Sequence, residues 1–238
     1  MHLLLTNDDG IDAPGLQALE RAARTLYPSA QISVVAPASE QSMCGHCVTT
    51  RKAIRVDEAG DGRWAVHGPS ADCVRIALFA LNLKPDWVLS GVNAGGNMGQ
   101  DIVISGTLAA AREAAYHGLK AAAFSHYLIR GLELDWQRVS TWTHRVFETL
   151  LEQPLADAEL WNVNFPHLPP GPCAMPALRH CKPERQPLDV AYHSVDSPEP
   201  AGHLQFHYTA SYADRPRAAG SDVEVCFGGG IAVSKLHL

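Results

Sequence analysis

Short apolar runs separated by helical patterns dominate the first two-thirds of this 238-residue chain. The runs lie at 2–6, 32–36, 87–92, 121–125 and 161–165. They lack the polar–apolar alternation of a half-exposed strand, so the strands are expected to be buried on both faces of a sheet. Helices are expected from Pro14 onward and over 70–83, 107–117 and 136–151, the second capped by Ser70 and ended by Pro85. This alternation predicts a doubly wound, Rossmann-like α/β fold with a mostly parallel sheet and right-handed crossovers.

The character of the chain changes after Pro166, where prolines crowd the stretch up to Pro200. Two strand-like pieces, 204–208 and 223–227, follow between turn signals. Residues 1–166 are therefore predicted to form the α/β core. Residues 167–238 are predicted to form an extension with β-hairpins that serves as an oligomerisation arm.

The composition excludes several classes of protein. The chain is 46% hydrophobic, which is enough for one substantial core, and only 18% charged, with a formal net charge of −6. An acidic protein lacks the basic face needed to grip a nucleic-acid polymer. No run reaches the roughly 18–20 apolar residues of a membrane span, and no cleavable signal peptide is expected. Six cysteines at irregular spacing do not suggest a disulfide framework, so a reducing cytoplasm is the expected location.

Polar residues and glycines follow the apolar runs, at what would be one end of the sheet. The polar segments are 7–10, 39–42, 90–101 and 162–164. Because ligands bind beyond the carboxyl ends of strands in open parallel sheets, this end is the expected site.

Asp8 and Asp9 are the most informative of these residues. Adjacent carboxylates at the end of a buried strand repel each other, and a divalent cation would offset that cost. With Ser42 and Asn93 they offer only hard oxygen ligands, which suit Mg²⁺ or Mn²⁺ better than Zn²⁺. The alternative is that 7–10 is simply a turn that caps the following helix, since Asn, Asp and Gly favour turns.

A glycine-rich loop over 95–99 and a helix start at Ser105, Gly106 and Thr107 are suited to binding an anion. Glycines allow close approach of the backbone, and free N–H groups at a helix start point toward a phosphate. Ser105 or Thr107 could equally serve only as the helix cap. Neither a P-loop nor a dinucleotide-binding fingerprint is present.

Cys44-Gly45-His46-Cys47 has the spacing of a thiol–disulfide oxidoreductase. A β-branched run, 48–50, follows it instead of a helix, and the motif comes after the second predicted strand. Two incidental thiols are therefore the favoured interpretation, and redox catalysis is kept as an alternative.

Together these segments resemble the SurE nucleotidases (survival protein E). The matching pieces are 3–11 with 13–16, 34–37, Gln41-Ser42 with Gly45-His46 and Thr49, 68–74, 85–93, then Gly95, Asn97, Gly99 and Asp101 up to Ser105-Gly106-Thr107, and 162–166. They span residues 2 to about 166 in order. Within the Cys-Gly-His-Cys segment, the glycine and histidine fit the family and the cysteines do not.

The resemblance implies a divalent-metal phosphatase, a 5′-nucleotidase acting on nucleoside 5′- and 3′-monophosphates and sometimes on short polyphosphate, in homodimers or homotetramers. It implies Asp8, Asp9, Ser42 and Asn93 as metal ligands. It also implies Asn97, Ser105, Gly106 and Thr107 around the phosphate.

For the mechanism, we expect a metal-activated water to attack phosphorus, with Asp8 and Asp9 as the catalytic carboxylates and direct attack by Asp8 as the minor alternative. No histidine is identified as the acid for the leaving group. A non-catalytic nucleotide-binding protein with the same pocket is the other alternative.

Overall fold

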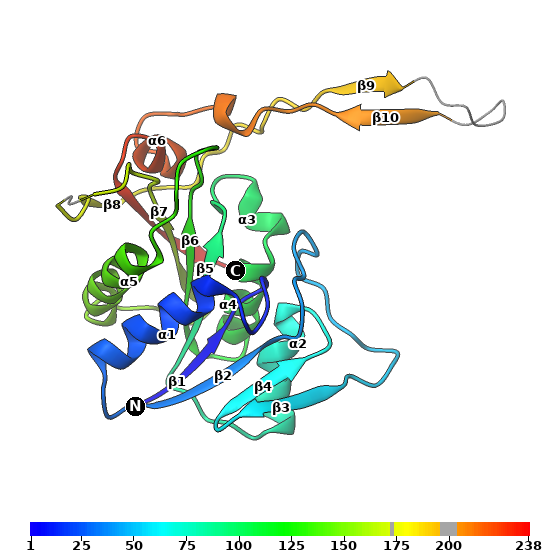
Figure 1. The fold of residues 1–238 in the computed structure, drawn as a ribbon, viewed down its shortest axis with the longest axis vertical. Coiled ribbons are helices and arrows are strands. Elements are labelled where there is room, and N and C mark those ends of the chain that lie inside the picture. The colour runs from blue at the N-terminus through cyan, green and yellow to red at the C-terminus, as the bar shows by residue number, and fades with distance from the viewer. Residues whose placement is uncertain (172–173, 196–203) are drawn as a thin grey trace.

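In a computed structural model that describes residues 1–171, 174–195 and 204–238, the chain forms a twisted sheet covered by helices on both faces (Figure 1). In the described residues the sheet has nine strands in the order β3-β4-β2-β1-β5-β6-β7-β11-β8. The strands are β1 (His2–Thr6), β2 (Gln31–Pro37), β3 (Val56–Gly60), β4 (Arg63–Val66), β5 (Trp87–Ala94), β6 (Lys120–His126), β7 (Glu159–Phe165), β8 (Leu178–His180) and β11 (Ile231–His237). Strands β4, β2, β1, β5, β6 and β7 are parallel, which confirms the predicted doubly wound, mostly parallel fold.

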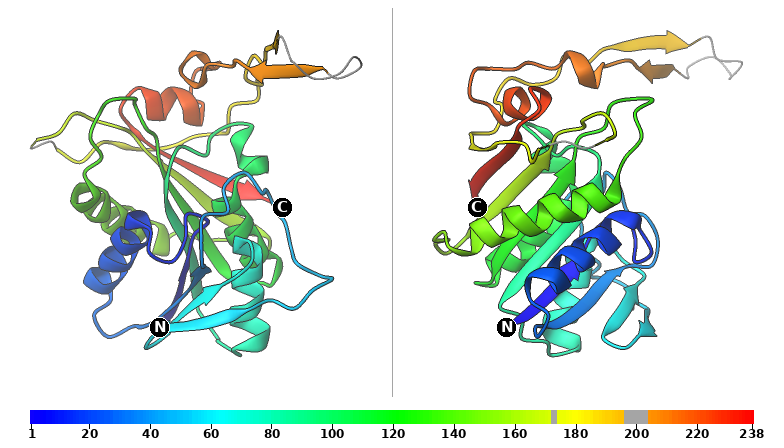
Figure 2. Two further views of the ribbon diagram at one scale, coloured as in Figure 1. Left: turned by 45° about the vertical axis from the view of Figure 1, so that its right-hand side comes forward. Right: turned by 60° about the vertical axis from the view of Figure 1, so that its left-hand side comes forward.

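Helices cover the sheet as two layers (Figure 2). Helices α1 (Pro14–Leu26) and α5 (Trp136–Leu151) lie on one face, and α2 (Ser70–Arg75) and α4 (Gly106–Tyr116) on the other. Successive side chains of a strand point to opposite faces, so Leu3 and Leu5 pack beneath α1 while Leu4 packs beneath α2 and α4. Both faces of β1 are therefore buried, as its apolar run predicts.

Two further elements of the core were not predicted. The β3–β4 pair is an antiparallel hairpin at the edge of the sheet, and β3 (VDEAG) is half exposed. Its polar sequence lacks the apolar signal that marks the central strands. The other is the short helix α3 (Asp101–Ile104), which follows the glycine-rich loop. A π-helix, η1 (Ile76–Ala80), continues α2 directly, so helical structure covers 70–80 of the predicted 70–83.

Two predictions of local structure were wrong. Residues 223–227 form most of α6 (Asp222–Phe227) rather than a strand, because the Ser221 side chain accepts a hydrogen bond from the Glu224 N–H and caps a helix there. Ser70 does not cap α2. Pro69 occupies that position, and the Ser70 hydroxyl instead donates to the Gly106 carbonyl at 2.6 Å.

The region after residue 166 contributes to the main sheet as well as to a hairpin. Strand β11 pairs antiparallel with β7, and β8 pairs parallel with β11. Strands β9 (Tyr192–Val195) and β10 (Gln205–Tyr208) form a separate antiparallel pair that projects from the body of the molecule, next to η2 (Tyr212–Asp214) (Figure 1). This pair is the kind of hairpin expected for the extension.

None of the helices in the described residues has the length and apolar character needed to cross a membrane. The five cysteines that the structure describes are all free thiols, and Cys173 lies outside the described residues.

Candidate functional site

The candidate site lies where the strand order reverses. Strand β1 sits between β2 and β5, so the chain leaves β1 on one side of the sheet and returns to β5 on the other. Helix α1, which follows β1, and helix α4, which follows β5, lie on opposite faces of the sheet, so the loops after these two strands diverge. In this fold a ligand usually binds at such a point. Asp8 and Asp9 follow β1, and Asn93 lies at the end of β5.

Asp8 is almost completely buried, with 4% of its surface exposed. One carboxylate oxygen, Oδ1, accepts a 2.6 Å hydrogen bond from the Thr107 hydroxyl at the start of α4. Burial raises the pKa of Asp8 to about 6, opposed by the hydrogen bond from Thr107 and reinforced by the neighbouring charge of Asp9. Keeping this carboxylate ionised at neutral pH is therefore costly unless a positive charge approaches it.

Asp9 is partly buried, and its Oδ2 accepts a hydrogen bond from the Ala94 N–H at 3.3 Å. Burial raises the pKa of Asp9 as well, and the nearby charge of Glu40 adds to the shift. In the part of the chain that the structure describes, no Lys, Arg or His lies within 4 Å of either aspartate carboxylate. The pair thus carries negative charge that the described side chains do not neutralise.

The turn over 7–10 does not depend on the two aspartates. The Asn7 amide donates to the Gly10 carbonyl at 2.8 Å, and the Gly10 N–H donates back to the Asn7 side chain at 3.3 Å. Helix α1 begins after Ala13 without any side-chain cap. Turn formation and helix capping therefore do not explain why carboxylates occupy positions 8 and 9.

The other two predicted metal ligands lie on loops that contact the aspartates. Asn93 precedes Ala94, whose N–H binds Asp9, and its own amide nitrogen donates to the Gly95 carbonyl at 2.8 Å. Ser42 follows Gln41, whose N–H donates to the Asp8 carbonyl at 2.7 Å. The Ser42 hydroxyl is exposed and donates to Glu40 Oε1 at 2.7 Å. The structure thus brings the three loops together, with Ser42 the most exposed of the four residues.

Asn97 is held rigidly on the glycine-rich loop. Its side-chain nitrogen donates to the Ser125 hydroxyl at 2.8 Å, and its backbone N–H donates to Asn164 Oδ1 at 2.8 Å. Its carbonyl accepts from the side chains of Asn162 at 2.9 Å and Asn164 at 3.1 Å. Asn162 and Asn164 can be recognised in the sequence as polar residues at a strand end, whereas no sequence signal identifies Ser125 as a contact of this loop.

At the start of α4 the side chains are already engaged. The Ser105 side chain caps the helix by accepting from the Leu108 N–H at 3.1 Å, and the Thr107 hydroxyl lies between Asp8 and Asn97. An anion here would therefore be bound mainly by the backbone N–H groups of the first turn. Gly106 has a separate function, because a Cβ atom at this position would lie 2.6 Å from Asp8 Oδ2.

The histidines near the site interact with groups other than Asp8 and Asp9. His46, which shares a loop with Ser42, pairs with Glu113 on α4 at 2.7 Å. Burial opposes ionisation of Glu113, but hydrogen bonds from His46, Arg75 and His117 lower its pKa to about 2. The Glu113 carboxylate therefore stays charged and anchors the Ser42 loop to α4.

His126, at the end of β6, is completely buried. Burial lowers its pKa to about 4, so the ring is neutral at physiological pH. A neutral ring at that pH is not a proton donor suited to the leaving group.

Cys44 and Cys47 are both exposed on a loop outside any helix. A redox-active thiol pair usually depends on a helix N-terminus to activate the first cysteine, and this loop does not offer one. We therefore keep them as incidental thiols.

Replacing Cys44 and Cys47 together with serine is expected to leave phosphatase activity within a few-fold of the parent. Phosphate release from a nucleoside monophosphate measures this directly, and insulin reduction tests the redox alternative in parallel. A hundredfold loss of phosphatase activity, equivalent to about 2.7 kcal/mol of transition-state stabilisation, would show that the thiols take part.

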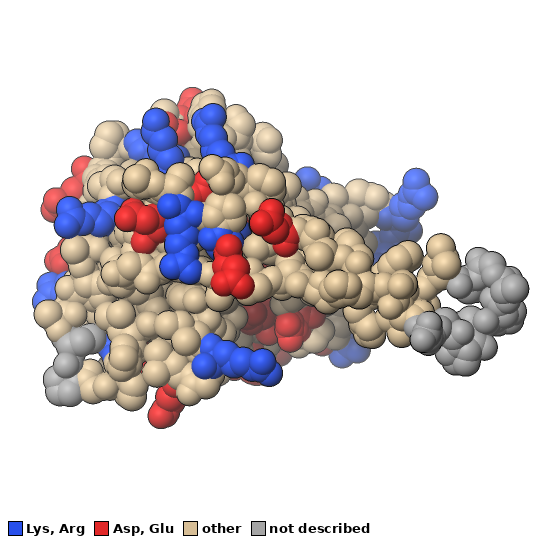
Figure 3. Space-filling model, turned by 90° about the horizontal axis from the view of Figure 1, so that it is seen from above, with Lys and Arg blue, Asp and Glu red and all other residues tan. Residues whose placement is uncertain are grey.

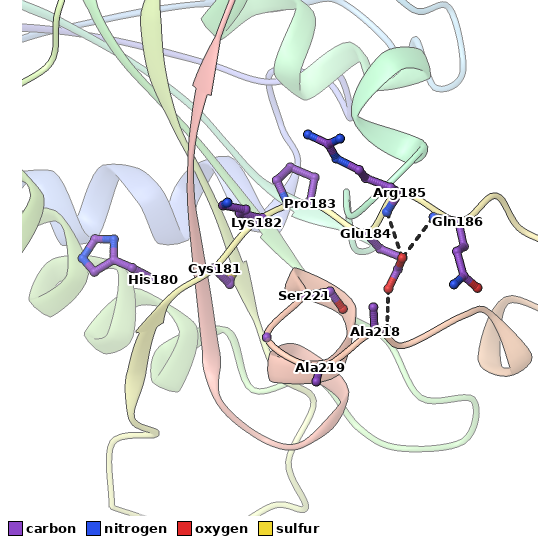
Figure 4. Close-up of a pocket in the computed structure, with 11 residues that line it drawn as sticks. His180, Cys181, Lys182, Pro183, Glu184, Arg185, Gln186, Ala218, Ala219 and Ser221 are labelled. Atoms are coloured by element: carbon purple, nitrogen blue, oxygen red, sulfur yellow. Dashed lines mark hydrogen bonds between the residues drawn. The ribbon is translucent and has the colours of Figure 1, made fainter.

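A cavity of about 660 Å³ lies in the extension, away from the aspartates (Figure 4). Its lining comes from 180–186 and 218–221, and none of the eight predicted site residues is among them. The predicted site residues therefore lie outside this cavity, which separates two segments of the extension.

Comparison with known proteins finds relatives that align with most or all of this chain. The model of the family described as "Survival protein SurE" matches residues 3–186. A candidate 5′-nucleotidase of Nostoc sp. is 44% identical and aligns over 100% of both chains. The 5′-nucleotidase SurE of Erythrobacter litoralis is 37% identical over 100% of this chain and 94% of its own length. The crystal structure of the SurE protein from Aquifex aeolicus superposes with a TM-score of 0.85 at 26% identity, covering 100% of this chain and 93% of that one.

Proposed function

Because the chain belongs to the SurE family, we propose that it is a metal-dependent 5′-nucleotidase, which hydrolyses nucleoside 5′-monophosphates to nucleoside and phosphate. The observation that carries the proposal is the pair Asp8–Asp9 at the switch point of the sheet. The Asp8 carboxylate is buried against the start of α4, and the partly buried Asp9 carboxylate lies at the end of β5. Their charge favours a divalent cation, and the helix start favours a phosphate.

The donor set fits Mg²⁺ or Mn²⁺. Asp8, Asp9, Ser42 and Asn93 would supply carboxylate, hydroxyl and amide oxygens, the ligands that these hard cations prefer. When bound, the cation would supply Lewis acidity at the phosphoryl group and activate a water for attack. In the described residues no group of three or more His, Cys, Asp or Glu side chains could hold a metal ion, and only two of the four proposed ligands are of those types.

The chain's own residues would orient the reacting groups. The Thr107 hydroxyl fixes the rotation of the Asp8 carboxylate, which leaves Oδ2 facing Gly106. The N–H groups at the start of α4 and the amide of Asn97 would stabilise negative charge on the phosphoryl oxygens. Phosphoryl transfer depends mainly on positioning and electrostatics, and groups of these kinds suit that reaction class.

A panel of substrates tests the function. Purified protein with and without added Mg²⁺ or Mn²⁺ is offered nucleoside 5′-monophosphates, 3′-monophosphates and short polyphosphate, and released phosphate is measured. We expect metal-dependent release from 5′-monophosphates, and we propose the 3′-monophosphates and polyphosphate as additional substrates. Nucleotide binding without any phosphate release would favour the non-catalytic alternative.

We also propose that the protein is a cytoplasmic homodimer or homotetramer. Tyr192, Phe206 and Tyr208 on the β9–β10 hairpin are more than half exposed, and neither strand contains a charged residue. The hairpin projects as a largely uncharged surface (Figure 3). An isolated two-stranded hairpin with exposed aromatic residues is marginally stable alone and suits burial against a second copy.

Light scattering at micromolar concentration is expected to show at least a dimer. Replacing Phe206 and Tyr208 with serine should shift the equilibrium toward the monomer by removing apolar contact area. Tyr116→Ser is the control, because Tyr116 is an aromatic residue exposed at 65%, against 56% for Phe206 and 54% for Tyr208, but lies at the end of α4. A monomeric parent, or equal effects of the two changes, would contradict the proposed arm.

A further inference from the structure

The glycine-rich loop is held from its outer side by residues far away in the sequence. The loop covers 95–101 and carries Asn97, and the residues that grip it lie between 184 and 222. Asn162, Asn164 and Ser125 hold the same loop from the sheet side. The loop is therefore fixed between the core and the extension.

Arg215 is the centre of the outer contacts. Only 4% of its surface is exposed, and its guanidinium donates both to the Asp101 carboxylate and, at 3.2 Å, to the Met98 carbonyl. The guanidinium also lies over the Tyr212 ring, 4.5 Å from its centroid. A planar fork can grip a carboxylate and a carbonyl together, whereas a lysine ammonium cannot reproduce that geometry.

Tyr212 reaches the other end of the loop. Its hydroxyl lies 3.1 Å from the Gly96 carbonyl and 3.1 Å from Asp101 Oδ2. A Cβ atom on Gly96 would lie only 2.9 Å from the same hydroxyl, so glycine is needed there for the close approach. The residues on both sides of Asn97 are thus tied to this segment, Gly96 by Tyr212 and Met98 by Arg215.

Asp222 also binds the loop and connects it to the rest of the extension. The side chain is fully buried, and its two oxygens accept from the Gly99 N–H at 2.9 Å and the Glu184 N–H at 2.8 Å. Glu184 in turn accepts from the N–H groups of Arg185, Gln186 and Ala218 across the cavity of the extension (Figure 4). Buried charges with this many partners are costly to disturb, so they specify one arrangement.

We propose that Tyr212, Arg215 and Asp222 are positioning residues for phosphate binding. They act through the loop, because they fix the backbone on both sides of Asn97 and so set the position of its side chain next to Thr107 at the start of α4, where the phosphate would bind. The proposal rests on the proposed nucleotidase function. It implies that the extension is part of the catalytic unit, because a displacement of about 1 Å at a positioning group can cost two orders of magnitude in rate.

The test compares Arg215→Met with Arg217→Met in the full-length protein. Arg217 belongs to the same segment but is exposed, and it contacts the Ala213 carbonyl and the Phe227 ring rather than the loop. Arg215→Met is expected to lower kcat/KM by at least about tenfold, which corresponds to about 1.4 kcal/mol. It should also raise the inhibition constant of inorganic phosphate about tenfold and leave Mn²⁺ affinity within twofold. Arg217→Met should change none of these.

Two further measurements keep the test decisive. Tyr212→Phe removes only the hydroxyl and keeps the ring contacts with Tyr127 and Phe227, so it should fold and show a smaller change in the same direction. Amide hydrogen exchange over 95–101 reports the loop without any substrate and should be faster in Arg215→Met than in Arg217→Met. If the parent hydrolysed no nucleotide but exchange was still faster in Arg215→Met than in Arg217→Met, the nucleotidase function would be refuted. The role of Arg215 in holding the loop would then stand. Unchanged exchange and unchanged phosphate inhibition in Arg215→Met and Tyr212→Phe would overturn the positioning role.

Discussion

Replacing Asp8 with asparagine is expected to lower nucleotidase activity at least about a hundredfold while the fold persists. Asparagine keeps the shape of the side chain and can still accept the Thr107 hydrogen bond, so the change removes little besides one negative charge. Without that charge the site should bind Mn²⁺ or Mg²⁺ more weakly and lose most of its activation of the reacting groups. Asp9→Asn is expected to act in the same direction. Rates of phosphate release at saturating nucleotide and metal provide the measurement.

In the absence of metal, Asp8→Asn is expected to make the folded protein more stable, although it lowers activity. Burial raises the folded-state pKa of Asp8 to about 6, well above the value of about 4 that is usual for an exposed aspartate. The folded state therefore binds the proton more tightly, and the stability gained from protonation is present below about pH 4 and lost as the pH rises through 6. At pH 7.5 in chelator, Asp8→Asn should unfold at a higher temperature than the parent. Its free energy of unfolding should be larger by up to about 3 kcal/mol. The difference should shrink as the pH falls from 6 to 4.

Asp12→Asn is the matched control for both the activity and the stability measurements, because Asp12 is exposed and lies four residues after Asp8. It should change neither activity nor the pH dependence of melting. If Asp8→Asn behaved like Asp12→Asn, the carboxylate pair would have no catalytic function.

Gly106→Ala is expected to reduce kcat/KM by about a hundredfold. The new methyl group would lie 2.6 Å from Asp8 Oδ2 and 2.8 Å from Asp8 Cβ, so the carboxylate must move away from its present position. Alanine is the better helix former by up to about 1 kcal/mol, so helix propensity alone predicts a neutral or stabilising change. Loss of activity with a preserved fold would therefore identify the steric effect on Asp8.

A double-mutant cycle distinguishes that effect from a general disturbance of the helix start. If Gly106→Ala acts through Asp8, it should cost far less in an Asp8→Asn background than in the parent. Equal costs in the two backgrounds would mean that Gly106 acts independently of Asp8, for example through its own N–H group.

The position of the site was predictable because it depends on a strong local signal. Runs such as 2–6 and 87–92 are apolar on both faces, so they must be central strands, and their carboxyl ends must meet at one edge. Asp8, Asp9 and Asn93 follow those strands directly, and the structure places their loops in contact. The bounds of α5 agree with the helix predicted over 136–151, because its apolar positions also form a local pattern.

The rest could not be predicted because its signal is not local. Arg215 and Asp222 contact the loop across more than 110 residues of sequence, and no periodic pattern connects them. Residues 223–227 look like a strand because two valines alternate with polar residues, and only the cap at Ser221 and the packing of Val223 and Cys226 decide for a helix. The predicted cap at Ser70 was wrong for a related reason, because the Ser70 hydroxyl donates to a carbonyl that is distant in the sequence, that of Gly106.

The central claim is that Asp8 and Asp9 hold a divalent cation that hydrolysis requires. Its most direct test is phosphate release from a nucleoside 5′-monophosphate by the parent protein after exhaustive chelation, followed by titration with Mn²⁺ or Mg²⁺. The account predicts activity reduced at least about a hundredfold in chelator and restored by either cation, with Asp8→Asn responding little at the same concentrations. Full activity in the chelated parent would contradict it.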